Sequence, residues 1–207
     1  MNSPTTRQTL LLRIREPDDA PAWREFVALY TPLLQKFALI RGVISQDVDD
    51  VVQEVLKAVV QAIKKFEYEP EKGTFRDWLF VVTRSKVARH FRKQAGVPRG
   101  AGGETMHRLI EEQPAPDSHA VWDLEYRRRM FTWASQQVKG QVSPKTWRAF
   151  WMTTVEDLPP DEVARELQLT IGAVYVAKSR VISRMREKIQ SVAGELTDFM
   201  PPTPDGE

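Results

Sequence analysis

Apolar residues recur at helical spacing along most of the chain, and this pattern predicts helices throughout. Within residues 21–42 they fall three or four positions apart, which predicts an amphipathic helix. These positions are Trp23, Phe26, Val27, Tyr30, Leu33, Leu34 and Phe37. A second pattern opens at Ser45, with carboxylates in its first turns that stabilise the positive end of a helix dipole. Its expected buried stripe consists of Val48, Val52, Val55, Val59 and Ile63.

Proline and glycine interrupt the middle of the chain. Pro70 and Gly73 end the second helical pattern, and a third helix is expected from about Thr74 to Lys93. Residues 96–117 are rich in glycine and proline, which favours a flexible connector with at most a short helix at residues 107–112. We therefore expect a domain boundary in this segment.

The second half of the chain ends in a helix-turn-helix pattern. One helix begins near Val121, and another spans residues 144–154 with Trp147, Phe150 and Trp151 as apolar anchors. Within residues 158–170, prolines and acids begin a short helix, and a tight turn then leads into a long helix over residues 171–192. Residues 197–207 are expected to form a disordered tail.

The long final helix separates into an apolar and an outward face. Thr170 stands where an N-cap is needed. The apolar side, expected to pack on the preceding short helix, holds Ile171, Val174, Ala177, Val181 and Met185. Outward residues are Gly172, Tyr175, Val176, Ser179 and Ser183, flanked by Lys178, Arg180, Arg184, Arg186 and Lys188. This arrangement suits a helix in a DNA major groove, with an ordinary solvated bundle helix as the alternative.

The third helix offers a second basic surface without an acid. Its cations are Arg84, Lys86, Arg89, Arg92 and Lys93. Lys86, Arg89 and Lys93 fall opposite the core positions, as expected for a helix that crosses a nucleic-acid backbone. A basic helix end is also common on solvated surfaces, but two basic helices joined by a connector favour two DNA sites.

Composition removes several classes of function. The chain has no cysteine, which excludes disulfides and thiolate metal sites. Its net charge is only +2. No stretch is long and apolar enough to span a membrane, so a cytoplasmic protein is expected. Its three histidines lack metal-ligand spacing, and helix capping explains the acids near Asp49 more simply than metal binding. A nuclease using that acidic group remains an alternative, testable by the dependence of any DNA cleavage on divalent metal.

Four segments carry a resemblance to a known family. DVDDVVQEVL at residues 47–56, residues 66–79 ending in GTFRDWL, and TRSKVARHFRK at residues 83–93 resemble region two of extracytoplasmic-function sigma factors. Residues 155–188 resemble region four of the same family. Together the matches cover nearly all of residues 20–196, in the family's order.

The resemblance implies three sets of binding residues. The polymerase's largest subunit would be bound through its clamp helices by Asp49, Asp50, Gln53, Glu54 and Lys57. The minus-ten element would be bound and opened by Lys72, Thr74, Arg84, Ser85, Lys86, Arg89, Arg92 and Lys93. The minus-thirty-five element would be read by Thr170, Gly172, Tyr175, Val176, Lys178, Ser179, Arg180, Ser183 and Arg184. The family commonly has Asn at Ser85, Asp at Arg89 and often arginines at Tyr175 and Ala177, so promoter preference does not transfer.

We therefore expect an all-α protein of two small helical domains joined by a flexible linker. The expected boundaries are a tail at residues 1–19, region two at 20–95, the linker at 96–121, region four at 122–196 and a tail at 197–207. Its expected partners are the beta and beta-prime subunits of the polymerase core and promoter DNA, with no cofactor and no enzymatic activity. A stand-alone helix-turn-helix regulator is the alternative, and control by an anti-sigma protein, a kinase or another route is left open.

Overall fold

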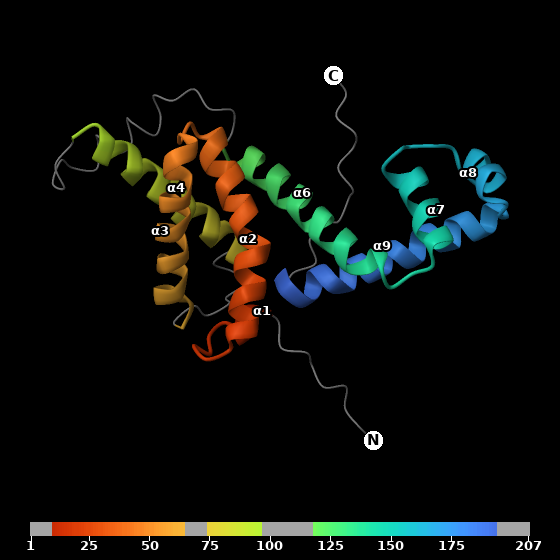
Figure 1. Ribbon diagram of the computed structural model, residues 1–207, viewed down its shortest axis with the longest axis horizontal. Coiled ribbons are helices and arrows are strands. Elements are labelled where there is room, and N and C mark those ends of the chain that lie inside the picture. Colours follow the sequence, from red (N-terminus) through yellow and green to blue (C-terminus); the bar gives the residue numbers. More distant parts are fainter. Residues whose placement is uncertain (1–9, 65–73, 97–117, 194–207) are drawn as a thin grey trace. The chain divides into compact units, whose positions relative to one another are not determined.

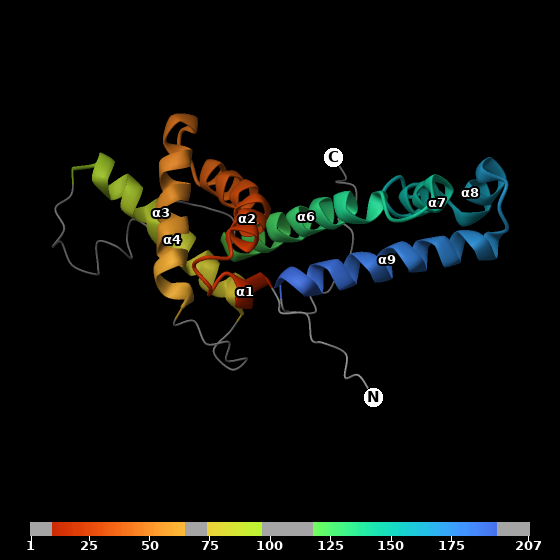
Figure 2. The ribbon, with the colours of Figure 1, turned by 60° about the horizontal axis from the view of Figure 1, so that its bottom comes forward.

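The computed structural model describes residues 10–64, 74–96 and 118–193, which form eight helices and no strand (Figures 1 and 2). The helices are α1 (Leu10–Arg13), α2 (Ala20–Ile40), α3 (Ser45–Ile63), α4 (Phe75–Gln94), α6 (Ser118–Lys139), α7 (Pro144–Thr154), α8 (Pro160–Leu167) and α9 (Ile171–Ala193). The expected all-α class is confirmed. No described helix is both long and apolar enough to cross a membrane. The expected short helix at residues 107–112 and the C-terminal tail lie outside the described residues.

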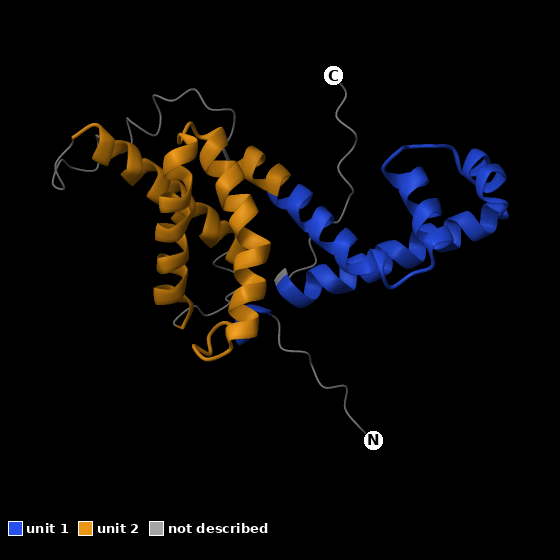
Figure 3. Cartoon of the chain, viewed as in Figure 1, with its two compact units in different colours: residues 1–13, 126–207 blue, residues 14–125 orange. Residues whose placement is uncertain are grey.

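The chain folds into two compact units (Figure 3). The N-terminal unit comprises residues 14–125, and the C-terminal unit comprises residues 1–13 and 126–207. This division falls later than the expected linker, because the first residues of α6 pack in the N-terminal unit. The Trp122 ring is fully buried there, with its centroid 5.2 Å from that of Phe37 and 5.7 Å from that of Phe80.

The expected N-terminal tail also contains ordered structure. Helix α1 lies within it, and α1 contacts α9 in the C-terminal unit. Leu10 is 2% exposed and Ile14 is 1% exposed, so both side chains are buried with the core residues. Burial of these apolar side chains explains why the chain is helical at this point although the segment was expected to be a tail.

Helices α2, α3 and α4 form the core of the N-terminal unit. The expected stripe of α3 is buried, with Val51 added to it. Aromatic rings join α2 to α4, with centroids 6.0 Å apart for Phe26 and Phe75. Val27, expected on the apolar side of α2, is instead 39% exposed. The apolar stripe of a helix is narrower than its run of apolar residues, and Val27 lies beyond its edge.

Helices α7, α8 and α9 form a helix-turn-helix in the C-terminal unit. One buried cluster joins them and consists of Ala149, Met152, Val163, Ala164, Val174 and Ala177. Gln168 ends α8 in the left-handed conformation, with φ 50°. Thr170 then caps α9, since its hydroxyl accepts a hydrogen bond of 3.1 Å from the Ala173 amide. Ile171 was expected in the apolar stripe but is 49% exposed, because it precedes the first residue of α9 that reaches the cluster.

Candidate nucleic-acid and protein interfaces

The polar side of α3 is open to solvent. The residues that the sequence assigned to polymerase binding, Asp49, Asp50, Gln53, Glu54 and Lys57, are all exposed. Val55 and Val59, on the opposite side of the same helix, are fully buried. Packing of the buried valines therefore fixes α3 so that one continuous polar face points outward. Gln35 of α2 donates a hydrogen bond of 2.9 Å to the Asp49 carboxylate and braces this face.

A groove of about 610 Å³ separates the polar face of α3 from α4. Glu54 lies in it, accepting a hydrogen bond of 3.0 Å from Lys57 and lying 4.0 Å from the Lys86 ammonium group. The pKa of Glu54 lies below its ordinary value, because Lys57 donates that hydrogen bond and nearby positive charges favour the carboxylate. The groove therefore brings together residues that the sequence assigned to two different partners.

Asp47 makes a second set of bridges between α3 and α4. Gln94 donates a hydrogen bond of 2.8 Å to its carboxylate, and the His90 ring nitrogen lies 3.4 Å from the same oxygen. The expected role of Asp47 was to cap the helix dipole, and it does stand in the first turn of α3. Its side chain also ties the end of α4 to α3.

The predicted minus-ten residues do not share one face of α4. Lys86, Arg89 and Lys93 line the groove beside α3. Ser85 is exposed outside the groove, and Arg84 lies over the Phe80 ring with its Cζ 5.9 Å from the ring centroid. Arg92 is half-buried in the last turn of α4. Lys72 lies outside the described residues.

Thr74, another predicted minus-ten residue, forms the N-cap of α4. Its hydroxyl accepts a hydrogen bond of 3.1 Å from the Asp77 amide, and the Asp77 carboxylate accepts one of 3.1 Å from the Thr74 amide. Burial alone would raise the pKa of Asp77, but the hydrogen bonds from Thr74 and the nearby charges of Arg76 and His119 together outweigh it and lower that pKa. This reciprocal capping box fixes where α4 begins.

The outward face of α9 carries the predicted minus-thirty-five residues. Tyr175 is 57% and Val176 is 56% exposed. Gly172, Ser179, Arg180 and Ser183 are exposed with them. Lys178 and Arg184 differ from these residues, because Lys178 donates to the Thr153 carbonyl at 3.4 Å and Arg184 donates to the Gln141 carbonyl. These two cations therefore brace the unit from inside as well as flanking its surface.

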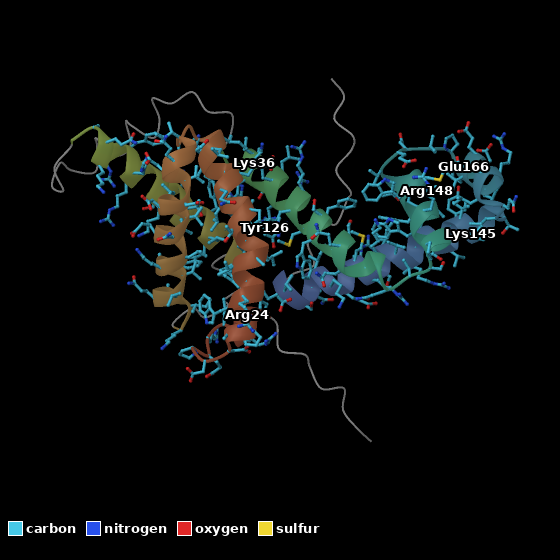
Figure 4. The ribbon with its side chains drawn as sticks, viewed as in Figure 1. Arg24, Lys36, Tyr126, Lys145, Arg148 and Glu166 are labelled. Carbon is cyan, nitrogen blue, oxygen red and sulfur yellow. The ribbon has the colours of Figure 1, made fainter. Side chains whose placement is uncertain are left out.

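Basic residues of α7 hold the turn of the helix-turn-helix, a role that sequence analysis missed. Lys145 donates a hydrogen bond of 3.3 Å to the carbonyl of Gln168, the left-handed residue of the turn. Arg148 lies 2.7 Å from Glu156 and 3.9 Å from Glu166 of α8, and Figure 4 labels Lys145, Arg148 and Glu166 in this region. Long-range partners of this kind have no local sequence signal.

A cleft of about 500 Å³ lies between α6 and α7. Trp147 and Trp151 line it from α7 and Phe131 lines it from α6. Two of the three expected anchors of α7 therefore face a cleft, and only Phe150 is fully buried. Among the described residues, no group of three or more His, Cys, Asp or Glu side chains could hold a metal ion.

The chain is similar in sequence to known proteins. The family description "Sigma-70 region 2" matches residues 26–97, which contain α3, α4 and the groove between them. The chain is 26% identical over 175 residues to the ECF RNA polymerase sigma factor SigD of Mycobacterium tuberculosis, covering 83% of this chain and 78% of that protein. It is 22% identical over 178 residues to the ECF RNA polymerase sigma factor RpoE of Cereibacter sphaeroides, covering 86% and 92%. The RNA polymerase sigma factor NccH of Alcaligenes xylosoxydans is 25% identical over 193 residues, covering 92% and 98%.

Proposed function

We propose that the chain belongs to the sigma-70 family of RNA polymerase sigma factors and to its extracytoplasmic-function type. From this premise, we propose that its two units make different contacts with polymerase and promoter DNA during transcription initiation. As a sigma factor it binds RNA polymerase and acts in the initiation of transcription. The N-terminal unit would bind the polymerase core and the minus-ten element, and the C-terminal unit would bind the minus-thirty-five element.

The polar face of α3 is the proposed docking surface for the beta-prime subunit. Asp50 and Gln53 are exposed on it, whereas the valines behind them are buried. Since these polar side chains do not pack in the core, they are free to contact a partner protein. A protein partner is favoured over DNA here, because exposed carboxylates repel a phosphate backbone.

Helix α9 is the proposed reader of the minus-thirty-five element. The single observation that carries this assignment is its outward face, where Tyr175 and Val176 are more than half exposed beside the small residues Gly172 and Ser179. Small neighbours allow close approach to base edges in the major groove, and the exposed Arg180 can reach the adjacent phosphates. The described part of α4, together with residues 66–73 before it, would contact the minus-ten element.

Sigma factors are regulatory, non-enzymatic proteins, and the proposal gives this chain no catalytic residue and no cofactor. It would act in the cytoplasm, stoichiometrically with the polymerase core. An anti-sigma protein is proposed only as an additional partner, which would control the chain by covering one of these surfaces.

Run-off transcription with purified core polymerase and a library of randomised promoters tests the proposal. We expect transcripts that depend on this chain and a selected set of promoters with two conserved elements. DNA binding without core polymerase, together with no chain-dependent transcript, would instead support the stand-alone regulator. Divalent-metal-dependent cleavage of the template would support the nuclease alternative.

A further inference from the structure

Helix α4 presents two different surfaces on either side of its buried stripe. Thr83 and Val87 lie in that stripe and are 1% and 4% exposed. On one side, Lys86, Arg89 and Lys93 face the groove beside α3. Outside the groove, Val81 is 57% exposed and Ser85 is exposed with it. The basic residues of α4 are therefore not one continuous strip.

The groove side carries charges of both signs. Its cations are Lys57, Lys86, Arg89 and Lys93, and its carboxylates are Asp47, Asp50 and Glu54. Glu54 alone is 3.0 Å from Lys57 and 4.0 Å from Lys86. A phosphate backbone entering this groove would meet these carboxylates as well as the cations. Alternating charges instead suit the surface of another protein, whose side chains can match both signs.

The opposite side of α4 carries fewer carboxylates in its own sequence. Asp77, in the capping box, is the one acidic residue of α4, and it lies at the start of the helix, where Asp123 of α6 also pairs with Arg76. Arg84 lies over the Phe80 ring, and Phe80 in turn contacts Phe37, with ring centroids 5.8 Å apart. Arg41 caps the C-terminus of α2 one turn after Phe37.

Two arginines flank the contact between Phe37 and Phe80, because Arg84 lies over the Phe80 ring and Arg41 follows Phe37 by one helical turn. Burial lowers the pKa of Arg41, and the positive charge of Arg84 lowers it further. Within the described residues, neither arginine forms an ion pair with a carboxylate. Two like charges without a counter-ion favour the binding of an anion such as a phosphate group.

We infer that the two sides of α4 serve different partners: Lys86, Arg89 and Lys93 bind acidic side chains of the polymerase in the groove, and promoter DNA binds the opposite side, where Arg41 joins Arg84. Val81 and Ser85 would then face the bases of the minus-ten element. Under this inference Arg41 is assigned to DNA binding, and the assigned partner of Lys86, Arg89 and Lys93 changes from DNA to polymerase. This inference rests on the proposed function and refines its assignment of α4.

Two matched substitutions separate the two sides. Arg89→Ala removes one cation from the groove, and Arg41→Ala removes one from the opposite side. The full-length chain, labelled at its N-terminus, is titrated with purified core polymerase to obtain its Kd. Promoter binding by each holoenzyme, formed at saturating core, is then measured from low to high salt.

We expect Arg89→Ala to raise the core Kd about tenfold and to leave the salt slope of promoter binding unchanged. Arg89→Lys keeps the charge and should restore core binding to within about twofold of wild type. Arg41→Ala should leave the core Kd within about twofold and lower the salt slope by about one, for one lost phosphate contact. If Arg41→Ala lowers the melting temperature, Arg84→Ala takes its place with the same expectation.

The inference is overturned if Arg89→Ala leaves the core Kd within about twofold of wild type, or if the substitution at Arg41 or Arg84 leaves the salt slope unchanged. Its failure is distinct from failure of the proposed function. If only the inference fails, the wild-type chain still binds core and promoter, and only the variants differ from expectation. If the proposed function fails, the wild-type chain itself does not bind core.

Discussion

The α3–α4 groove of the N-terminal unit and the outward face of α9 in the C-terminal unit differ most in where their acids lie. In the groove, carboxylates alternate with cations and form direct pairs, such as that of Glu54 with Lys57 at 3.0 Å. Along the whole of α9 the one acidic residue is Glu187, two turns beyond the centre of its outward face. A surface that keeps its acids suits a protein partner, and a surface without them suits DNA.

The two surfaces also differ in what supports them. Trp122 of α6 packs against Phe80 of α4, with ring centroids 5.7 Å apart, so the core that holds α4 depends on an aromatic ring contributed by α6. The face of α9 depends on small and branched residues of the α7–α8–α9 cluster and on hydrogen bonds from α7 to the turn. Separate cores mean that each surface can be damaged alone, which makes the comparison testable.

The largest effect should come from Trp122→Ala. Because this ring is fully buried, its removal should cost about 3–5 kcal/mol of unfolding free energy. Urea denaturation measures the loss, and hydrogen exchange should rise in α2 and α4 while α8 and α9 remain protected. Trp147→Ala is the matched control, since Trp147 is half-buried beside a cleft and should cost less. Equal losses in the two variants would contradict the assignment of Trp122 to the N-terminal core.

Next in size is the double substitution Asp50→Ala and Gln53→Ala. Both side chains are exposed, so the fold should change by less than about 0.5 kcal/mol. Loss of two interface contacts should weaken core binding about tenfold or more, measured by titration of the labelled chain. Asp18→Ala removes an exposed carboxylate outside α3 and should bind core as wild type does. Wild-type affinity in the double variant would show that α3 does not dock on polymerase.

Removing the N-caps of α4 and α9 should have a smaller effect on stability, and for α4 this effect should depend on pH. Thr74→Ala should cost about 1 kcal/mol at neutral pH, because it breaks the capping box that begins α4. The lowered pKa of Asp77 contributes stability that is present above the unfolded carboxyl pKa of about 3.9 and is lost as pH falls through the folded value. The cost of Thr74→Ala should therefore shrink below about pH 4.

Thr170→Ala provides the comparison for α9. Thr170 caps α9, but no acidic residue stands in the first turn of that helix. Its cost, also about 1 kcal/mol, should not change over the same pH range. Thermal melts of both variants between neutral and acid pH measure the difference, and the same pH dependence for the two caps would refute the role given to Asp77.

The smallest effect concerns the division of roles on α9. Arg180→Ala should lower the salt slope of binding to a randomised minus-thirty-five library by about one, equally for all sequences. Ser179→Ala should change the selected sequences and leave the slope unchanged. Arg184→Ala should lower the slope less than Arg180→Ala, because Arg184 donates to the Gln141 carbonyl. A change of base preference in Arg180→Ala, with none in Ser179→Ala, would mean that the helix is rotated in the groove.

Local periodicity predicted the helices well, because a buried stripe repeats along the sequence. It identified the valine stripe of α3 and the apolar side of α9 from Val174 to Met185. It also identified the N-cap role of Thr170, which depends on a neighbour only three residues away. Trp78 of α4 is half-buried, and its ring centroid lies 5.4 Å from that of Phe75.

Contacts between distant residues were not predictable in the same way. Trp122 has the same helical spacing as Tyr126, yet the two residues belong to different units. The sequence assigned Glu54 and Lys86 to different partners, and only the packing of α3 on α4 brings them together. The polymerase and minus-ten assignments themselves remain predictions that the variants above can test.

Site-specific photo-crosslinking in the promoter complex tests the central division of labour most directly. A photoreactive amino acid is placed at Gln53 of α3 in one variant and at Tyr175 of α9 in another, both positions being exposed. The full-length variants are assembled with core polymerase and promoter DNA, then irradiated. We predict that position 53 crosslinks to the largest polymerase subunit and position 175 to DNA in the minus-thirty-five region. Crosslinks from position 53 to DNA, or from position 175 to polymerase alone, would contradict the account.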